Sequence, residues 1–158
     1  MKEENYILKV LNLRQEYECT KDKRFKLTQP YDVVQFLTKE IGSLSKEHFL
    51  MIGLNTKNEV NVVYTVHKGS LNWSIAHPRD SFQVAILHNC QSVIFAHNHP
   101  SQDVTPSPND IRIAKKFKVI GKLLDIEVLD SFVITDEGYA SLEALDYLDI
   151  DFDINEIF

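Results

Sequence analysis

Two periods of hydrophobic and polar residues run along the chain, and together they predict a mixed α/β order. Short runs that alternate, or are rich in Val and Ile, predict strands over residues 5–13, 48–55, 60–66, 92–97, 126–134 and 138–142. The second and third of these flank the turn-like sequence TKNE, which predicts a β-hairpin. The fourth is almost wholly apolar, as expected of a strand that is covered on both faces.

Three other segments show helical spacing. Residues 30–41 begin at a proline, carry apolar residues at helical intervals and end before Gly42. In residues 77–89, the side expected to be buried consists of Phe82, Val84, Ala85, Ile86 and Leu87. A third helix is predicted to begin at Pro108 with Ser107 as its N-cap, and its apolar stripe is Ile113, Phe117, Ile120 and Leu124. Helices that interrupt strand pairs predict a mixed sheet flanked by helices.

Length and composition indicate one globular domain. The chain has 158 residues, of which 44% are hydrophobic and 25% charged, the usual balance of a folded domain. No apolar run approaches the roughly 18 residues that span a bilayer, and the start, MKEENYILKV, lacks the regions of a secretory signal. We therefore expect a cytoplasmic protein with no membrane partner. Cys19 and Cys90 form no CxxC pair and are expected to be reduced thiols.

The net charge of −6 comes from the C-terminal end of the chain. Residues 143–158 contain no Lys or Arg, and their acidic residues are Glu143, Asp146, Asp149, Asp151, Asp153 and Glu156. An acidic balance counts against broad contact with nucleic-acid phosphates. Neither GxGxxG nor GxxxxGK occurs, so a glycine-rich nucleotide loop is disfavoured as well. The chemistry is expected elsewhere.

The sequence HNH at residues 97–99 is the strongest chemical signal. Alternate residues of an extended segment point to one face, so His97 and His99 suit a shared cation while Asn98 points away. Asp110 follows after ten intervening residues, at the start of the third helix, where it could supply an anionic ligand. Two His and one carboxylate leave a position open for water, as in catalytic zinc sites, where that water ionises near neutral pH.

Each part of this signal also has a plain structural interpretation. An isolated HxH is common at strand ends, and Asp110 is explained as the acid of a capping box with Ser107. The combined pattern HxHPxxxxxxSxxD is far more specific than either part. It is the signature of the JAMM metalloproteases.

The segment HNHPSQDVTPSPNDI closely resembles the metal-site segment of RadC-like members of the MPN/JAB family, as do the shorter segments TKN, GSLN and HPR. The resemblance implies a JAMM/MPN-like fold with Zn2+ held by His97, His99 and Asp110. It also implies that Glu47 is the general acid/base and that Ser107 helps to stabilise the tetrahedral oxyanion.

The resemblance divides the chain into three parts. Residues 1–44 are expected to form an N-terminal strand-and-helix extension, 45–142 the metallohydrolase core, and 143–158 an acidic tail. No glycine precedes Gly42, so we expect none of the DNA-binding helix-hairpin-helix region of full-length RadC-like proteins. The domain would then be the catalytic part alone.

These observations favour a zinc metallohydrolase that cleaves a peptide or isopeptide bond in a peptide or protein substrate. The alternative is a noncatalytic MPN-type interaction module that acts with DNA-repair or other DNA-processing partners. Direct DNA binding is a third hypothesis, and it predicts an affinity that falls steeply with salt. A nuclease of the HNH class is disfavoured because the three letters stand far apart in that class. The sequence indicates neither the substrate nor the oligomeric state.

Overall fold

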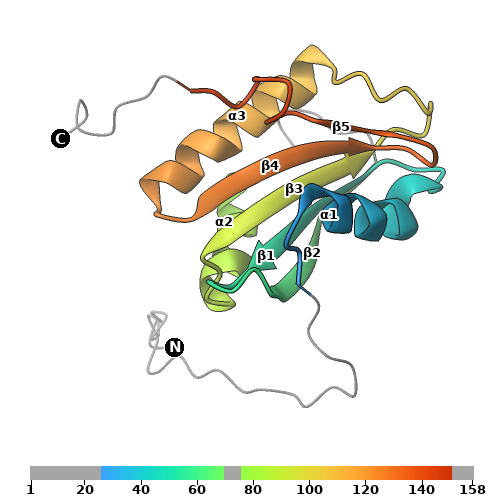
Figure 1. Ribbon diagram of the computed structural model, residues 1–158. Coiled ribbons are helices and arrows are strands. Elements are labelled where there is room, and N and C mark those ends of the chain that lie inside the picture. The colour runs from blue at the N-terminus through green and yellow to red at the C-terminus, as the bar shows by residue number, and fades with distance from the viewer. Residues whose placement is uncertain (1–25, 70–75, 151–158) are drawn as a thin grey trace, which may run out of the picture.

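The computed structural model describes residues 26–69 and 76–150 (Figure 1). The strand predicted over residues 5–13 and the last residues of the acidic tail lie outside this range. Five strands form one mixed sheet in the order β2-β1-β3-β4-β5. The strands are β1 (His48–Leu54), β2 (Val60–Lys68), β3 (Ser92–Asn98), β4 (Glu127–Ile134) and β5 (Tyr139–Ser141). The helices are α1 (Pro30–Leu37), η1 (Thr38–Gly42), α2 (Pro78–Leu87) and α3 (Pro108–Leu123).

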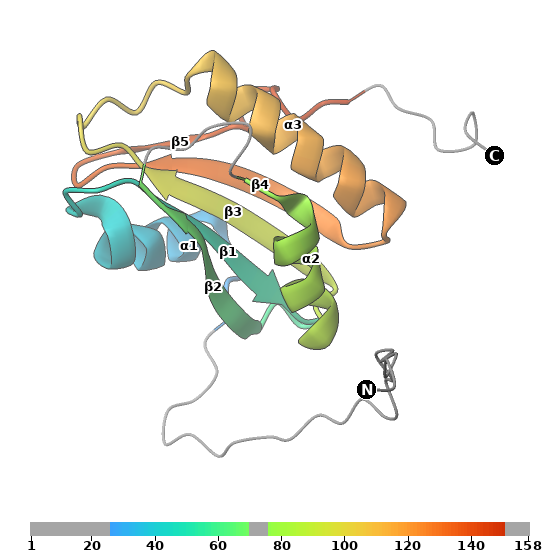
Figure 2. The same cartoon turned by 180° about the vertical axis from the view of Figure 1, so that it is seen from behind.

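Helices cover both faces of the sheet. Helix α1 lies on one face (Figure 1), whereas α2 and α3 lie on the other, which faces the viewer in Figure 2. The predicted α/β architecture, a mixed sheet flanked by helices, is therefore confirmed. Because side chains alternate along each strand, successive residues of β1 and β3 enter two different hydrophobic cores.

Each core has its own composition. Between the sheet and the helix pair α2 and α3, four aromatic rings pack together, and the closest two, Phe95 and Phe117, have centroids 4.4 Å apart. Between the sheet and α1, aliphatic residues such as Leu37, Ile52 and Ile94 dominate. Every residue of β3 is buried, as predicted for a strand covered on both faces.

The strand connections bring the ends of two strands and the start of a helix to one end of the sheet. Strands β1 and β2 form the predicted antiparallel hairpin, and β1 also pairs antiparallel with β3. Strands β3 and β4 are parallel, so the chain must cross back between them, and α3 makes that crossover. The start of β1, the end of β3 and the start of α3 consequently meet at the same end (Figure 1).

Three sequence predictions about helices need correction. Ile86, Leu87 and Leu124 were expected to be buried, but they are 53%, 48% and 45% exposed. The run of consecutive apolar residues in α2 covers more than one side of a helix, because each residue turns by about 100°, so its last two members reach the surface. Leu124 lies just beyond the end of α3. The final turn of the first predicted helix is the wider π-helix η1.

Residues on either side of the predicted 45–142 core also pack into the fold. Leu27, Val33 and Leu37 belong to the core under α1, and Leu148 packs with Leu142 in a small cluster beside α3. The division into extension, core and tail stays a prediction. Among the described residues, no helix combines the length and apolar character needed to cross a bilayer.

Candidate metal centre

Four side chains with metal-binding atoms converge where β3 ends and α3 begins. One ligand atom from each of Glu47, His97, His99 and Asp110 lies within 4.8 Å of the others. His97 is the penultimate residue of β3, His99 follows the strand, and Asp110 lies in the first turn of α3. The fold thus brings together His97, His99 and Asp110, which the sequence pattern singled out. Asp110 comes close to the histidines because α3 begins near the end of β3 and crosses back over the sheet.

The distances among the three predicted ligands suit a small tetrahedral ion. The Nε2 atoms of His97 and His99 lie 3.0 Å apart. Each lies 3.3 Å from a carboxylate oxygen of Asp110, Oδ1 for His97 and Oδ2 for His99. Ligand bonds of about 2.0–2.1 Å in a tetrahedron place ligand atoms about 3.3–3.4 Å apart. Two imidazoles and a carboxylate at this spacing could therefore hold a metal ion.

His99 is held in the orientation that a metal ligand needs. Its Nδ1 lies 2.7 Å from the backbone oxygen of Asp103, and a carbonyl oxygen can only accept, so Nδ1 carries the proton. The lone pair of Nε2 is then free to face the centre of the cluster. Without a metal, the hydrogen bond to Asp110 raises the pKa of His99, although partial burial opposes this.

Asp110 is buried, with 6% of its surface exposed, and it serves two structures at once. Burial alone opposes ionisation, but hydrogen bonds from His97 and His99 and from the backbone of Ser107 keep its pKa below the usual range. The predicted capping box is present: Asp110 Oδ2 accepts from Ser107 N at 2.7 Å, and Ser107 Oγ accepts from Asp110 N at 3.1 Å. The cap therefore fixes the carboxylate that faces the histidines.

Glu47 reaches the cluster from a distant part of the chain. It immediately precedes β1 and does not lie within it, and the last β1–β3 pair, Phe49 with His97, sets its position beside the histidines. Its backbone oxygen accepts a hydrogen bond from Gly69 N at 2.8 Å. Local sequence gave no reason to place Glu47 here, and only the resemblance pointed to it.

Asn98 points to the opposite face, as predicted from alternation, and it is fully buried. The sequence gave it no role. In the structure its side chain binds the backbone of residues 44–48, with the shortest bond, 2.7 Å, from His48 N to Asn98 Oδ1. One sequence signal could have indicated this role. Asn98 is a polar residue between two predicted ligands at the end of a strand expected to be buried on both faces, so its amide must find hydrogen-bond partners.

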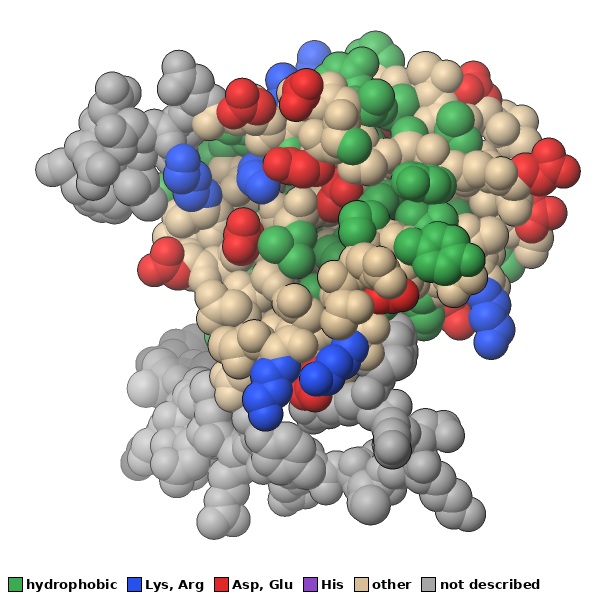
Figure 3. Space-filling view, in the orientation of Figure 1, with side chains coloured by type: hydrophobic (Ala, Val, Ile, Leu, Met, Phe, Trp, Pro, Cys, Tyr) green, Lys and Arg blue, Asp and Glu red, His purple; other side chains and the backbone are tan. Residues whose placement is uncertain are grey.

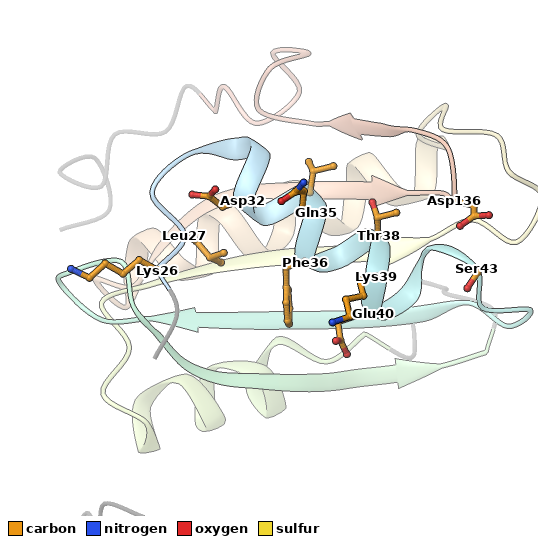
Figure 4. A pocket seen from close by; sticks show the side chains of 11 residues that line it. Lys26, Leu27, Asp32, Gln35, Phe36, Thr38, Lys39, Glu40, Ser43 and Asp136 are labelled. Atoms are coloured by element: carbon orange, nitrogen blue, oxygen red, sulfur yellow. The ribbon is translucent and has the colours of Figure 1, made fainter. Parts of the chain in front are cut away.

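Within residues 26–69 and 76–150, other groups of polar residues do not form a comparable site. His88 Nδ1 binds the backbone oxygen of Val84, and burial raises the pKa of Cys90 to about 11, so this pair has structural roles. A hollow beside α1 contains Asp32, Glu40 and Asp136, but these acids lie well apart along it (Figure 4). On the face that carries α1, acidic, basic and hydrophobic side chains are interspersed with no extended basic patch (Figure 3).

Comparison of the sequence with known proteins identifies its relatives. A family model described as RadC-like JAB domain matches residues 27–147, a wider range than the 45–142 expected from the motifs. A UPF0758 protein of Caldanaerobacter subterraneus is 42% identical over 84% of this chain and 57% of the relative. UPF0758 proteins of Staphylococcus haemolyticus and Enterococcus faecalis are 43% and 42% identical, over 82% and 80% of this chain and 57% and 54% of theirs. The chain thus spans little more than half the length of these relatives.

Proposed function

The chain belongs to the RadC-like JAB domain family, and on that premise we propose that it is a zinc-dependent hydrolase of JAMM type that cleaves a peptide or isopeptide bond. One observation carries the proposal: the ligand atoms of His97, His99 and Asp110, and a carboxylate oxygen of Glu47, lie within 4.8 Å of one another. Structural zinc sites use four protein ligands, whereas three ligands beside an acid are the arrangement of catalytic sites.

The residues of the site have two proposed roles, metal binding and proton transfer. His97, His99 and Asp110 would hold the zinc ion, which when bound activates water for attack on a carbonyl group. Glu47 is placed to accept a proton from the attacking water and to deliver it to the leaving amine. Its backbone oxygen is hydrogen-bonded to Gly69 N, and it lies two residues before Phe49, which pairs with His97 in the β1–β3 ladder.

We infer that Ser107 stabilises the negative oxygen that forms on the carbonyl. Its Oγ accepts the N–H of Asp110 in the capping box, and a hydroxyl that accepts a bond retains its own proton for donation. Capping and oxyanion stabilisation therefore use different parts of the same group. A donor of this kind typically contributes about 100-fold or more to the rate.

The first test is metal content. We expect about one zinc per chain in the purified protein, and we expect the double variant His97→Ala/His99→Ala to lose it. His88→Ala, which removes a histidine outside the cluster, should keep it. If the wild type holds no zinc even after incubation with the ion, the hydrolase proposal fails and a noncatalytic interaction module becomes the better account.

The second test is cleavage. The zinc-loaded protein is screened against a set of internally quenched peptides and against counterparts joined through a lysine side chain. Cleavage by the wild type that falls by about 100- to 10,000-fold in Glu47→Gln, with the zinc content unchanged, supports the assigned roles. Equal cleavage by Glu47→Gln would contradict the role of Glu47.

A further inference from the structure

The side-chain amide of Asn98 forms three hydrogen bonds, all to the backbone of residues 44–48. Its Oδ1 accepts from His48 N at 2.7 Å, and its Nδ2 donates to the backbone oxygens of Leu44 and Lys46 at 3.1 and 3.0 Å. The segment bound in this way brackets Glu47 on both sides. The side chain is fully buried, so these bonds are not shared with bulk water.

These hydrogen bonds of Asn98 lie just beyond the end of the β1–β3 ladder. The β1–β3 ladder ends at the pair Phe49 and His97, so no strand pair between β1 and β3 reaches Glu47. Asn98 extends the connection beyond the ladder with its side chain. On the other side, Gly69 N donates to the backbone oxygen of Glu47. The backbone around Glu47 is thus bonded to the last residue of β3 and to the residue that follows β2.

Asparagine is the side chain that this arrangement requires. The contacts need one acceptor for an N–H and two donors for carbonyl oxygens, and a neutral carboxamide offers both. Aspartate has the same shape but would place an acceptor against the two carbonyls. Leucine has a similar size but would leave His48 N and the backbone oxygens of Leu44 and Lys46 without these hydrogen bonds.

We propose that Asn98 is a positioning residue that holds Glu47 over the metal centre by binding the backbone on either side of it. The same strand end thereby presents ligands on one face and fixes the acid/base through the other. The inference deepens the proposed function and rests on it for the chemical role of Glu47. The placement itself can be tested without any turnover.

Amide hydrogen exchange tests the placement directly. In Asn98→Ala we expect the His48 amide to exchange at least tenfold faster and the Gly69 amide to follow it, with the zinc content unchanged. The matched control is Asn55→Ala at the other end of β1, whose side chain accepts from Lys57 N and Glu59 N. It should accelerate those two amides and leave His48 unaffected.

Kinetics then separate positioning from general destabilisation. With a peptide that the wild type cleaves, Asn98→Ala should lower kcat by about 100-fold with KM unchanged, since misplacing a catalytic group by about 1 Å costs that much. In a Glu47→Gln background the same change should cost nothing more, because Asn98 acts through Glu47. An equal, additive loss in both backgrounds would overturn the proposal.

The outcomes remain distinguishable if one variant or one hypothesis fails. Should Asn98→Ala not fold, Asn98→Asp keeps the shape and the acceptor for His48, and it is expected to accelerate Gly69 exchange and lower kcat. If the wild type cleaves no peptide, the proposed function has failed, while His48 exchange still decides the placement. Wild-type exchange at both amides in a folded Asn98 variant would refute the positioning role.

Discussion

Ser107 and Asp110 each accept a hydrogen bond from the other's backbone N–H, at 3.1 and 2.7 Å, and the acid of this pair also faces two histidines. A helix start and a proposed metal ligand are therefore built from the same few atoms. Asp110 cannot change rotamer without giving up the cap, so the start of α3 fixes the orientation of its carboxylate.

Ser107→Ala tests the two roles of the hydroxyl. Loss of the cap should lower the free energy of unfolding by about 1 kcal/mol, measured by urea denaturation. Zinc content should persist, because Asp110 keeps the backbone donor of Ser107. The proposed oxyanion role adds a fall in kcat of about 100-fold. Ser107→Thr, which restores a hydroxyl, should recover stability. Unchanged stability in Ser107→Ala would contradict the capping role.

The stability of the metal-free protein should depend on pH through His99. Its pKa is raised in the folded state, chiefly by the hydrogen bond to Asp110, above the ordinary 6.5. The folded state therefore holds this proton more tightly than the unfolded chain. The resulting stability is fully present below pH 6.5 and is lost as the pH rises through the raised pKa.

Urea unfolding in the presence of a chelator, at pH 6 and pH 8, measures this effect. We expect the wild type to be more stable at pH 6 by an increment that Asp110→Asn removes, because that change takes away the carboxylate. Zinc should compete with the proton and stabilise the protein more strongly at pH 8 than at pH 6. The same pH increment in Asp110→Asn would show that its source lies elsewhere.

Gly53, the penultimate residue of β1, should tolerate no side chain. A Cβ there would lie 2.3 Å from Cys90 Sγ and 2.8 Å from Val62 Cγ1. Gly53→Ala should cost about 3 kcal/mol by overpacking, measured by urea unfolding. At Gly138 the nearest atom would be 3.4 Å away, so Gly138→Ala should remain within about 0.5 kcal/mol of the wild type. Equal costs would refute the steric argument.

Cys90 should be chemically inert in the folded protein. Burial raises the pKa of its thiol from 9.0 to about 11, so almost no thiolate is present at pH 8. In a Cys19→Ser background, Ellman's reagent should label Cys90 only after unfolding. Because the unfolded thiol ionises first, stability should also fall between about pH 9 and pH 11. Cys90→Ala should lack that part of the fall, and rapid labelling of the native protein would contradict burial.

The sequence predicted the local parts of this structure well. The alternation of His97, Asn98 and His99 follows from the period of a strand, and the start of α3 follows from the Ser107-Pro108 cap. Both are properties of a few consecutive residues. The hairpin and the buried strand β3 were predictable for the same reason, since each depends on short-range pattern.

What the sequence could not predict depends on pairings between distant segments. Glu47 comes near the histidines only because β1 lies beside β3, and the contacts of Asn98 depend on the same pairing. Likewise, Ile86 and Leu87 are apolar enough for a core, but the placement of α2 on the sheet leaves them outside. Composition cannot distinguish such residues from buried ones.

The connection through α3 has a consequence for how the centre assembles. The three predicted ligands lie in one short stretch of chain, so bringing them together requires closure of only a small loop, which is entropically cheap. Glu47 arrives by a different route, through pairing of strands that are far apart in sequence. The proposed metal ligands are therefore joined through one short loop, whereas the proposed acid/base joins them through a long-range strand pairing.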